Sequence, residues 1–154
     1  MRRIGAFLYR YAKHLNLHYD AIAGLPNAGT LIAKGFKEAA KKDGRNVPMV
    51  VLHKEEEGER REIVGVIDYA GFHDQLAEGK EIVILVLDDL ITHGKTKEEG
   101  LRVLERDKFT VRDVLVFMDR EQGGTAYLRE RGQTLRAPTT LRWAVQHGGN
   151  TRVP

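Results

Sequence analysis

Residues 82–100 read IVILVLDDLITHGKTKEEG, and this stretch decides the fold. Its first six residues are all apolar, which is typical of a strand covered on both faces in a parallel sheet. The acids Asp88 and Asp89 follow directly, then a turn at residues 92–96, then a segment with helical character. The stretch therefore predicts a buried strand at 82–87 that leads through an acidic pair and a loop into a helix at 97–106.

The loop between this strand and helix has the features of an anion site. Thr96 and Glu99 form a Thr-x-x-Glu pattern, which predicts a capping box that starts the helix at Thr96. Backbone N–H groups at a helix N-terminus favour negative charge, and Gly94 permits a backbone conformation that brings them close to a phosphate. Ligands of open α/β sheets bind at the carboxyl ends of the strands, where this loop lies. We therefore expect a phosphate-binding loop.

The acidic pair narrows the class of phosphorylated ligand. Gly94, Lys95 and Thr96 look like the end of a P-loop, but that pattern needs a glycine at position 89, which is Asp89 here. Two carboxylates ahead of a phosphate loop instead suit a ribose 5-phosphate, whose hydroxyls donate to them, or a Mg²⁺ ion. The alternative is an acidic strand end followed by an ordinary capped turn.

Helical and apolar segments alternate along the rest of the chain. The predicted helices are 1–15, 30–42, 97–106, 124–131 and 141–147, and the predicted strands are 19–24, 47–52, 82–87 and 111–118. This alternation predicts an α/β fold, with a mostly parallel central sheet flanked by helices, in a single domain spanning residues 1–154. Leu141 and Trp143 are expected to pack a terminal helix.

Residues 54–68, KEEEGERREIVGVID, interrupt the alternation between two strands. The segment is charged at its start and contains Gly58 and Gly65, so one interpretation is a solvated β-hairpin or loop. The other interpretation is a mobile lid over an active site, because lids come from segments with few buried contacts. The sequence is compatible with both.

Composition excludes several classes of protein. The 154 residues include no cysteine, which excludes a disulfide framework, a thiolate zinc site and a cysteine nucleophile. The apolar runs are far shorter than the roughly 20 residues of a membrane helix, and the N-terminus lacks a signal-peptide core, so we expect a cytoplasmic protein with no membrane contact. The 25 Lys and Arg are interspersed with 22 Asp and Glu, without a basic stripe, so we expect no nucleic-acid partner.

Three motifs resemble one known family. Residues 85–96, LVLDDLITHGKT, are similar to the phosphoribosyl pyrophosphate signature of type I phosphoribosyltransferases. Residues 117–124, FMDREQGG, are similar to a segment typical of orotate phosphoribosyltransferases, and residues 24–29, GLPNAG, are similar to the family's pyrophosphate loop. The resemblance runs in register from about Ile4 to His147. It implies the type I phosphoribosyltransferase fold, with residues from about 54 to 68 as its lid.

The resemblance also implies a reaction. A nitrogen of orotate would attack C1′ of phosphoribosyl pyrophosphate and expel pyrophosphate with its Mg²⁺, giving orotidine 5′-phosphate in pyrimidine nucleotide biosynthesis. This chemistry needs no covalent enzyme nucleophile, so catalysis would rest on positioning and electrostatics. The implied cofactor is Mg²⁺, carried by the substrate with Asp88 and Asp89 as candidate ligands, and the implied assembly is a homodimer.

Each motif then has an implied role. Asp88 and Asp89 would hold the ribose hydroxyls and act at the reacting centre. Lys54, at the base of the lid, would stabilise the leaving group, and the planar guanidinium of Arg120 would pair with the orotate carboxylate. The implied 5-phosphate ligands are Thr92, His93, Gly94, Lys95 and Thr96, and the implied pyrophosphate ligands are Pro26, Asn27, Ala28 and Gly29.

Two of these residues also have a simpler interpretation. Arg120 fits a surface arginine that pairs with the neighbouring Asp119 or Glu121. Lys54 fits a counter-ion of the glutamates that follow it.

The sequence departs from the family at two places. Three glutamates, Glu55, Glu56 and Glu57, follow Lys54 where the lid of orotate enzymes carries a second lysine, and the lid histidine of those enzymes is missing. Their carboxylates would repel pyrophosphate unless the two arginines at 60–61 compensate. The sequence also starts at about the first helix, so base contacts from a preceding segment are not expected. These departures keep two alternatives open: a phosphoribosyltransferase for another base, and a catalytically weak regulator that binds phosphoribosyl pyrophosphate or a nucleotide.

Overall fold

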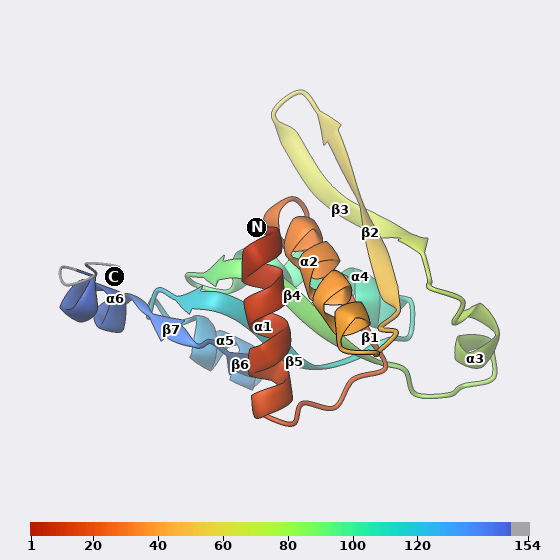
Figure 1. Ribbon diagram of the computed structural model, residues 1–154. Helices are drawn as coiled ribbons and strands as arrows, with labels where there is room; N and C mark the ends of the chain where they lie inside the picture. Colours follow the sequence, from red (N-terminus) through yellow and green to blue (C-terminus); the bar gives the residue numbers. More distant parts are fainter. Residues whose placement is uncertain (149–154) are drawn as a thin grey trace.

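The computed structural model describes residues 1–148, and its centre is a seven-stranded sheet (Figure 1). Residues 149–154 of the predicted domain lie outside the described residues. The strands are β1 (Ala21–Gly24), β2 (Met49–Glu57), β3 (Arg60–Asp68), β4 (Val83–Ile91), β5 (Thr110–Asp119), β6 (Thr134–Arg136) and β7 (Thr139–Thr140). Hydrogen-bonded neighbours follow the order β3-β2-β1-β4-β5-β6, and β7 pairs with β5.

Every strand pairing is parallel except that of β2 with β3. Strand β4 lies between β1 and β5, and its residues 83–88 are all buried. A strand in this position has no solvent-facing side, which explains the unbroken apolar run in the sequence. The predicted mostly parallel α/β fold is therefore confirmed.

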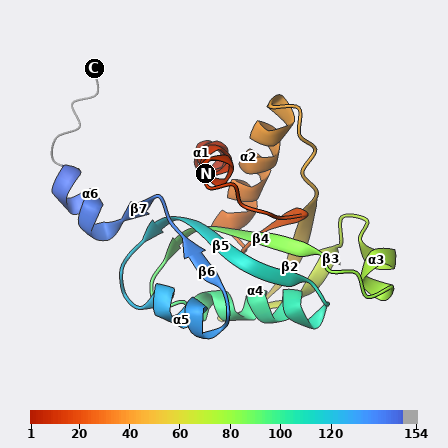
Figure 2. The ribbon, with the colours of Figure 1, turned by 90° about the horizontal axis from the view of Figure 1, so that it is seen from below.

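Helices cover both faces of the sheet (Figure 2). Figure 2 shows α1 (Arg2–His14) and α2 (Ala28–Lys42) on one face, with α4 (Lys95–Arg106) and α5 (Gly124–Glu130) on the other. Strand β4 serves both layers, because successive side chains point to opposite faces. Leu85 and Leu87 join the apolar cluster under α1 and α2, whereas Ile84 and Val86 join the cluster that contains α4.

Residues 54–68 form part of a two-stranded arm. Strands β2 and β3 pair antiparallel up to the Glu57–Arg60 register, and the arm projects away from the body of the molecule (Figure 1). Gly58 makes the turn at a φ of +60°, a conformation that favours glycine. Only the root of the arm is buried, at Leu52 and Ile63, which pack with the α4 cluster. The predicted hairpin is confirmed, and its strands are longer than the predicted strand 47–52.

Several element boundaries differ from the prediction. Strand β4 continues through the acidic pair to Ile91, because β5 supplies hydrogen-bond partners along that whole length. Helix α4 begins at Lys95 with Gly94 as its N-cap and no side-chain capping bond, so the predicted capping box at Thr96 is wrong. Gly94, at a φ of +89°, has already turned the chain into the helix before Thr96.

The shortest elements and the packing of the terminal helix were not correctly predicted. Helix α3 (His73–Ala77) and strands β6 and β7 are too short to produce a clear periodicity. Helix α6 (Leu141–His147) exists as predicted, but Trp143 is 56% exposed, so its expected packing role is wrong. Thr140 caps this helix instead by accepting a hydrogen bond from the Trp143 backbone N–H. Within residues 1–148, no helix is long and apolar enough to cross a membrane.

Candidate functional site

The candidate site lies at the carboxyl ends of the central strands. Gly24, the last residue of β1, is in register with Leu87, so residues 88–91 of β4 continue past the end of β1. This extension pairs with β5 up to the register of Ile91 with Asp119. The loops that follow β1, β4 and β5 therefore leave the sheet at one edge, which is where open α/β sheets bind ligands.

The predicted phosphate loop and the predicted base-binding turn are in direct contact. The Nδ1 atom of His93 lies 2.8 Å from the backbone oxygen of Gln122. The backbone N–H of Arg120 donates to the Ile91 oxygen at 3.0 Å. Two motifs that lie some 30 positions apart in the sequence thus form one continuous surface.

Glycine is required where the phosphate loop meets α5. A Cβ atom built on Gly94 would lie 2.5 Å from the ring of Tyr127, and the backbone φ of +89° also disfavours any other residue. A Cβ on Gly124 would lie 2.7 Å from the Ile91 side chain and 2.8 Å from the Thr92 oxygen. The loop after β4 is therefore pressed against α5, so its backbone conformation is fixed by packing.

The predicted pyrophosphate loop packs against β4 in a similar way. The Leu25 N–H donates to the Leu87 oxygen at 3.0 Å. A Cβ on Gly29 would lie 2.5 Å from that same oxygen and 3.3 Å from Oδ1 of Asp88. The Pro26–Asn27 peptide bond in this loop is cis. Helix α2 begins immediately afterwards at Ala28, so its N-terminal N–H groups lie near Asp88.

The two acids of the pair have different environments. Asp88 is buried, forms an ion pair with the equally buried Lys97, and accepts a hydrogen bond from the Asp89 N–H at 2.9 Å. Burial raises the pKa of Asp88 to about 6, against the opposing effect of the Lys97 charge. Asp89 is half-buried and has no ion-pair partner in residues 1–148. Asp89 is therefore the member of the pair whose charge is left to a ligand.

Sequence reasoning missed Lys97. The residue lies on the buried side of α4 together with Gly100, Leu101 and Leu104. These four positions follow the helical repeat of a core-facing stripe, and a lysine in such a stripe needs a buried counter-charge. This pattern could have predicted a buried ion pair of Lys97 with an acidic residue.

Lys54 lies on β2, beyond the point where β2 leaves β1. Val50 is in register with Ala23 near the end of β1, so Lys54 rises above the same edge as the loops. Its Nζ lies 3.3 Å from Oε1 of Glu56. The interpretation of Lys54 as a counter-ion of a neighbouring glutamate is thus confirmed, and its role toward a leaving group stays a prediction.

Arg120 is exposed and has no carboxylate within ion-pair distance in the described chain. Glu121 instead contacts Arg142, whose backbone N–H donates to it at 3.0 Å. Asp119 accepts bonds from the Glu121 N–H at 2.8 Å and the Thr125 hydroxyl at 3.1 Å. The interpretation of Arg120 as the partner of either acid is therefore wrong, and its guanidinium is left for another group.

Several known proteins are similar to this chain in sequence, and they include orotate phosphoribosyltransferases. The chain is 24% identical over 143 residues to uridine 5′-monophosphate synthase of Bos taurus, which matches 92% of this chain and 26% of that protein. It is 29% identical over 117 residues to orotate phosphoribosyltransferase of Caenorhabditis elegans, covering 75% of this chain and 44% of that protein. It is 30% identical over 132 residues to orotate phosphoribosyltransferase of Leptospira biflexa, covering 84% and 65%. The chain is therefore similar in sequence to the orotate enzymes among the type I phosphoribosyltransferases.

Solved structures support the same assignment. A phosphoribosyltransferase from Corynebacterium diphtheriae is similar with a TM-score of 0.67 at 26% identity, covering 92% of this chain and 74% of that one. An orotate phosphoribosyltransferase from Francisella tularensis has a TM-score of 0.71 at 15% identity, covering 96% and 70%, and so supports the fold. No protein-family model matches the chain. Among these proteins the chain is most like the orotate phosphoribosyltransferases, although it spans less than half the length of the cattle and nematode proteins.

Proposed function

We propose that this phosphoribosyltransferase domain transfers the 5-phosphoribosyl group of phosphoribosyl pyrophosphate to orotate. The observation that carries the proposal is the contact between His93 and Gln122, which joins the phosphate loop to the turn typical of orotate enzymes. The names of the similar proteins, orotate phosphoribosyltransferase and uridine 5′-monophosphate synthase, agree with this choice of substrate.

The 5-phosphate is held after β4. Loop residues 92–94 and the first turn of α4 supply backbone N–H groups, and a helix of 12 residues adds the positive end of its dipole. The exposed Lys95 and the hydroxyls of Thr92 and Thr96 complete the donor set. Because packing against Tyr127 fixes the Gly94 turn, these donors are in place before the ligand arrives.

The ribose hydroxyls donate to Asp89. Asp88 is neutralised by Lys97, so the sugar meets one uncompensated carboxylate rather than two. A single negative charge stabilises the cationic ring that develops as the C1′–O bond breaks, and it repels the nearby phosphate less than a pair would. Asp88 then fixes the backbone at Asp89 through its hydrogen bond to the Asp89 N–H.

Pyrophosphate leaves toward the loop after β1. Residues 26–29 and the start of α2 present backbone N–H groups there, and Lys54 on the arm is the cation proposed to stabilise the leaving group. The electron pair of the breaking bond goes to the pyrophosphate oxygen. A ring nitrogen of orotate forms the new bond to C1′, and its proton passes to the departing pyrophosphate or to water. Arg120 receives the orotate carboxylate through its planar fork of donors.

The residues present fit a Mg²⁺ ion that the substrate carries. No group of three or more His, Asp or Glu side chains within residues 1–148 could hold a metal by itself. Mg²⁺ keeps several waters and binds substrate phosphates with one or two protein carboxylates, a demand that Asp89 alone satisfies. When bound, the ion offsets the negative charge of the departing pyrophosphate.

The test is turnover of the full chain with phosphoribosyl pyrophosphate, Mg²⁺ and a panel of bases. We expect Mg²⁺-dependent loss of orotate absorbance with release of pyrophosphate, and loss of that turnover in Asp89→Asn. Turnover with a different base and none with orotate would contradict the choice of base. Binding of phosphoribosyl pyrophosphate without turnover of any base would instead support a catalytically weak regulator. The ion pair between Lys54 and Glu56 favours this alternative, because it engages the cation that the lid would offer to the leaving group.

Four further features belong to the proposal. We expect the acting form to be a homodimer, and residues 54–68 to serve as its lid. The single domain and the cytoplasmic localisation stay predictions. Size-exclusion chromatography with light scattering measures the first of these directly.

A further inference from the structure

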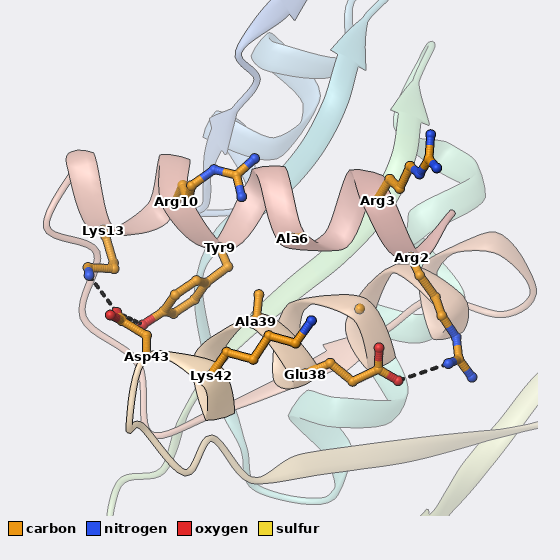
Figure 3. Close-up of a pocket in the computed structure, with 11 residues that line it drawn as sticks. Arg2, Arg3, Ala6, Tyr9, Arg10, Lys13, Glu38, Ala39, Lys42 and Asp43 are labelled. Carbon is orange, nitrogen blue, oxygen red and sulfur yellow. Dashed lines mark hydrogen bonds and ion pairs between the residues drawn. The ribbon is translucent and has the colours of Figure 1, made fainter.

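A groove between α1 and α2 lies away from the candidate site (Figure 3). Its volume is about 550 Å³, within the range typical of small-molecule sites. Its lining comes from residues 2–13 of α1 and residues 35–43, at the end of α2 farther from the pyrophosphate loop. No residue assigned above to the phosphoribosyl site lines it.

The groove holds the charge surplus of the chain. Five Lys and Arg side chains line it, against Glu38 and Asp43 as the only acids. The difference of three equals the formal net charge of the whole protein, which is +3. The remaining charges of the chain sum to zero, and the groove carries a local excess of three positive charges.

Both acids already have partners at the two ends of the groove. Glu38 pairs with Arg2 at 3.0 Å, and Asp43 pairs with Lys13 at 2.5 Å. The bond from Lys13 and a second from the Tyr9 hydroxyl hold the pKa of Asp43 below its usual value. Figure 3 shows these two contacts at opposite ends of the hollow.

The cations between the two ends have no acidic partner. Arg3, Arg10 and Lys42 make no ion pair with any carboxylate of residues 1–148. Arg3 and Arg10 are seven residues apart on α1, about two turns or roughly 10 Å, and so share one face. Figure 3 shows both side chains at the rim of the groove, extending from α1 on the side away from α2. Lys42 reaches up from α2 between the helices, and the small side chains of Ala6 and Ala39 leave room beside it (Figure 3).

This arrangement specifies a ligand with several linked anionic groups. Guanidinium forks bind phosphate oxygens through two donors, and a lysine adds a point charge. The carboxylates at the two ends disfavour a polymer that would run through the groove, so the hollow suits a short ligand rather than a nucleic acid. We propose that the α1–α2 groove binds a small polyphosphate, either inorganic or as the polyphosphate chain of a nucleotide.

The test is calorimetry of the full chain with inorganic tripolyphosphate, in the presence of saturating phosphoribosyl pyrophosphate to fill both the β4 loop and the loop after β1. We expect binding that weakens as salt rises, and at least about tenfold weaker binding in the triple variant Arg3→Gln/Arg10→Gln/Lys42→Gln. The matched control is Lys34→Gln/Lys37→Gln/Arg129→Gln, which removes three exposed cations outside the groove and is expected to bind normally. ATP and UTP are titrated in parallel: equal affinity for all three assigns the site to the phosphates, and tighter binding of a nucleotide assigns it to nucleotides.

Two results would overturn the proposal: no heat with any of the three polyphosphates, or equal weakening in the triple variant and its control. The result is independent of the proposed function. An Asp89→Asn chain that loses transfer but keeps tripolyphosphate binding separates the two sites. A chain without transfer to any base but with normal groove binding would contradict the proposed function alone.

Discussion

Replacement of Lys97 by methionine is the sharpest perturbation of the candidate site. The Lys97 and Asp88 side chains are 8% and 10% exposed, so the variant leaves a buried carboxylate without its counter-ion. Breaking a buried ion pair from one side costs about 3–5 kcal/mol. Asp88 can avoid an unpaired buried charge by taking up a proton. Holding a carboxyl of ordinary pKa neutral near pH 7 costs roughly 4 kcal/mol, and this cost limits the loss of stability. We therefore expect Lys97→Met to lose about 3–4 kcal/mol of unfolding free energy.

The pH dependence gives this prediction its sign. The folded-state pKa of Asp88 is raised to about 6, above its unfolded value, so its ionisation opposes folding as pH rises through that value. Burial raises the pKa of Asp88, and the Lys97 charge lowers it. Removal of Lys97 therefore raises the pKa of Asp88 further. The loss of stability in Lys97→Met should therefore be large near pH 7.5 and smaller near pH 5, where Asp88 is protonated in both proteins.

Urea unfolding of the parent, Lys97→Met and the double variant Asp88→Asn/Lys97→Met at the two pH values measures these effects. The double variant removes both charges and should recover most of the lost stability. Lys95→Met, on the exposed face of the same helix, is the control and should change stability by less than about 0.5 kcal/mol. A single variant as stable as the parent near pH 7.5, or a double variant no better than the single one, would refute the reasoning.

Three other predictions follow from the site. Gly94→Ala forces a methyl group against the Tyr127 ring at a positive φ. Thermal unfolding should therefore show a loss of about 1–3 kcal/mol of unfolding free energy, and calorimetry should show weaker binding of ribose 5-phosphate. Unchanged values of both would contradict a loop whose conformation is fixed by packing. Glu56→Gln releases Lys54 from its ion pair, so steady-state kinetics should show a lower KM for phosphoribosyl pyrophosphate, and a higher KM would argue against the lid role of Lys54. Arg120→Gln should raise the KM for orotate by about tenfold or more with little change for phosphoribosyl pyrophosphate, and an equal rise for both substrates would place Arg120 elsewhere.

The sequence was sufficient for the elements whose pattern is local. The apolar run before Asp88 predicted a strand buried on both faces, and the alternation of strands and helices predicted the parallel sheet. The loop between β4 and α4 was predicted because the acidic pair and Gly94 lie only a few residues apart in the chain, and its binding of a phosphate stays a prediction. Its attachment to α5 could not be predicted, because the ring of Tyr127 reaches it only through the tertiary fold.

The electrostatics of the site could not be predicted from neighbouring residues in the sequence, for the same reason. The sequence shows two adjacent acids and does not distinguish their environments. Only the tertiary fold brings Lys97 of α4 onto Asp88 and leaves Asp89 without an ion-pair partner in the described chain. The start of α4 was misplaced because a Thr-x-x-Glu pattern competes with a glycine turn, and the packed glycine prevailed. The arm was similarly ambiguous, because the charges of its outer half describe a solvated strand as well as a loop.

The central claim is that the loop after β4 binds the phosphate of a phosphoribosyl group while Asp89 takes the sugar hydroxyls. A crystal structure of the full chain soaked with phosphoribosyl pyrophosphate and Mg²⁺ tests it most directly. The account predicts density for the 5-phosphate at residues 92–96, with the ribose hydroxyls on Asp89 and Asp88 still paired with Lys97. A sugar phosphate bound elsewhere while this loop stays empty would contradict it.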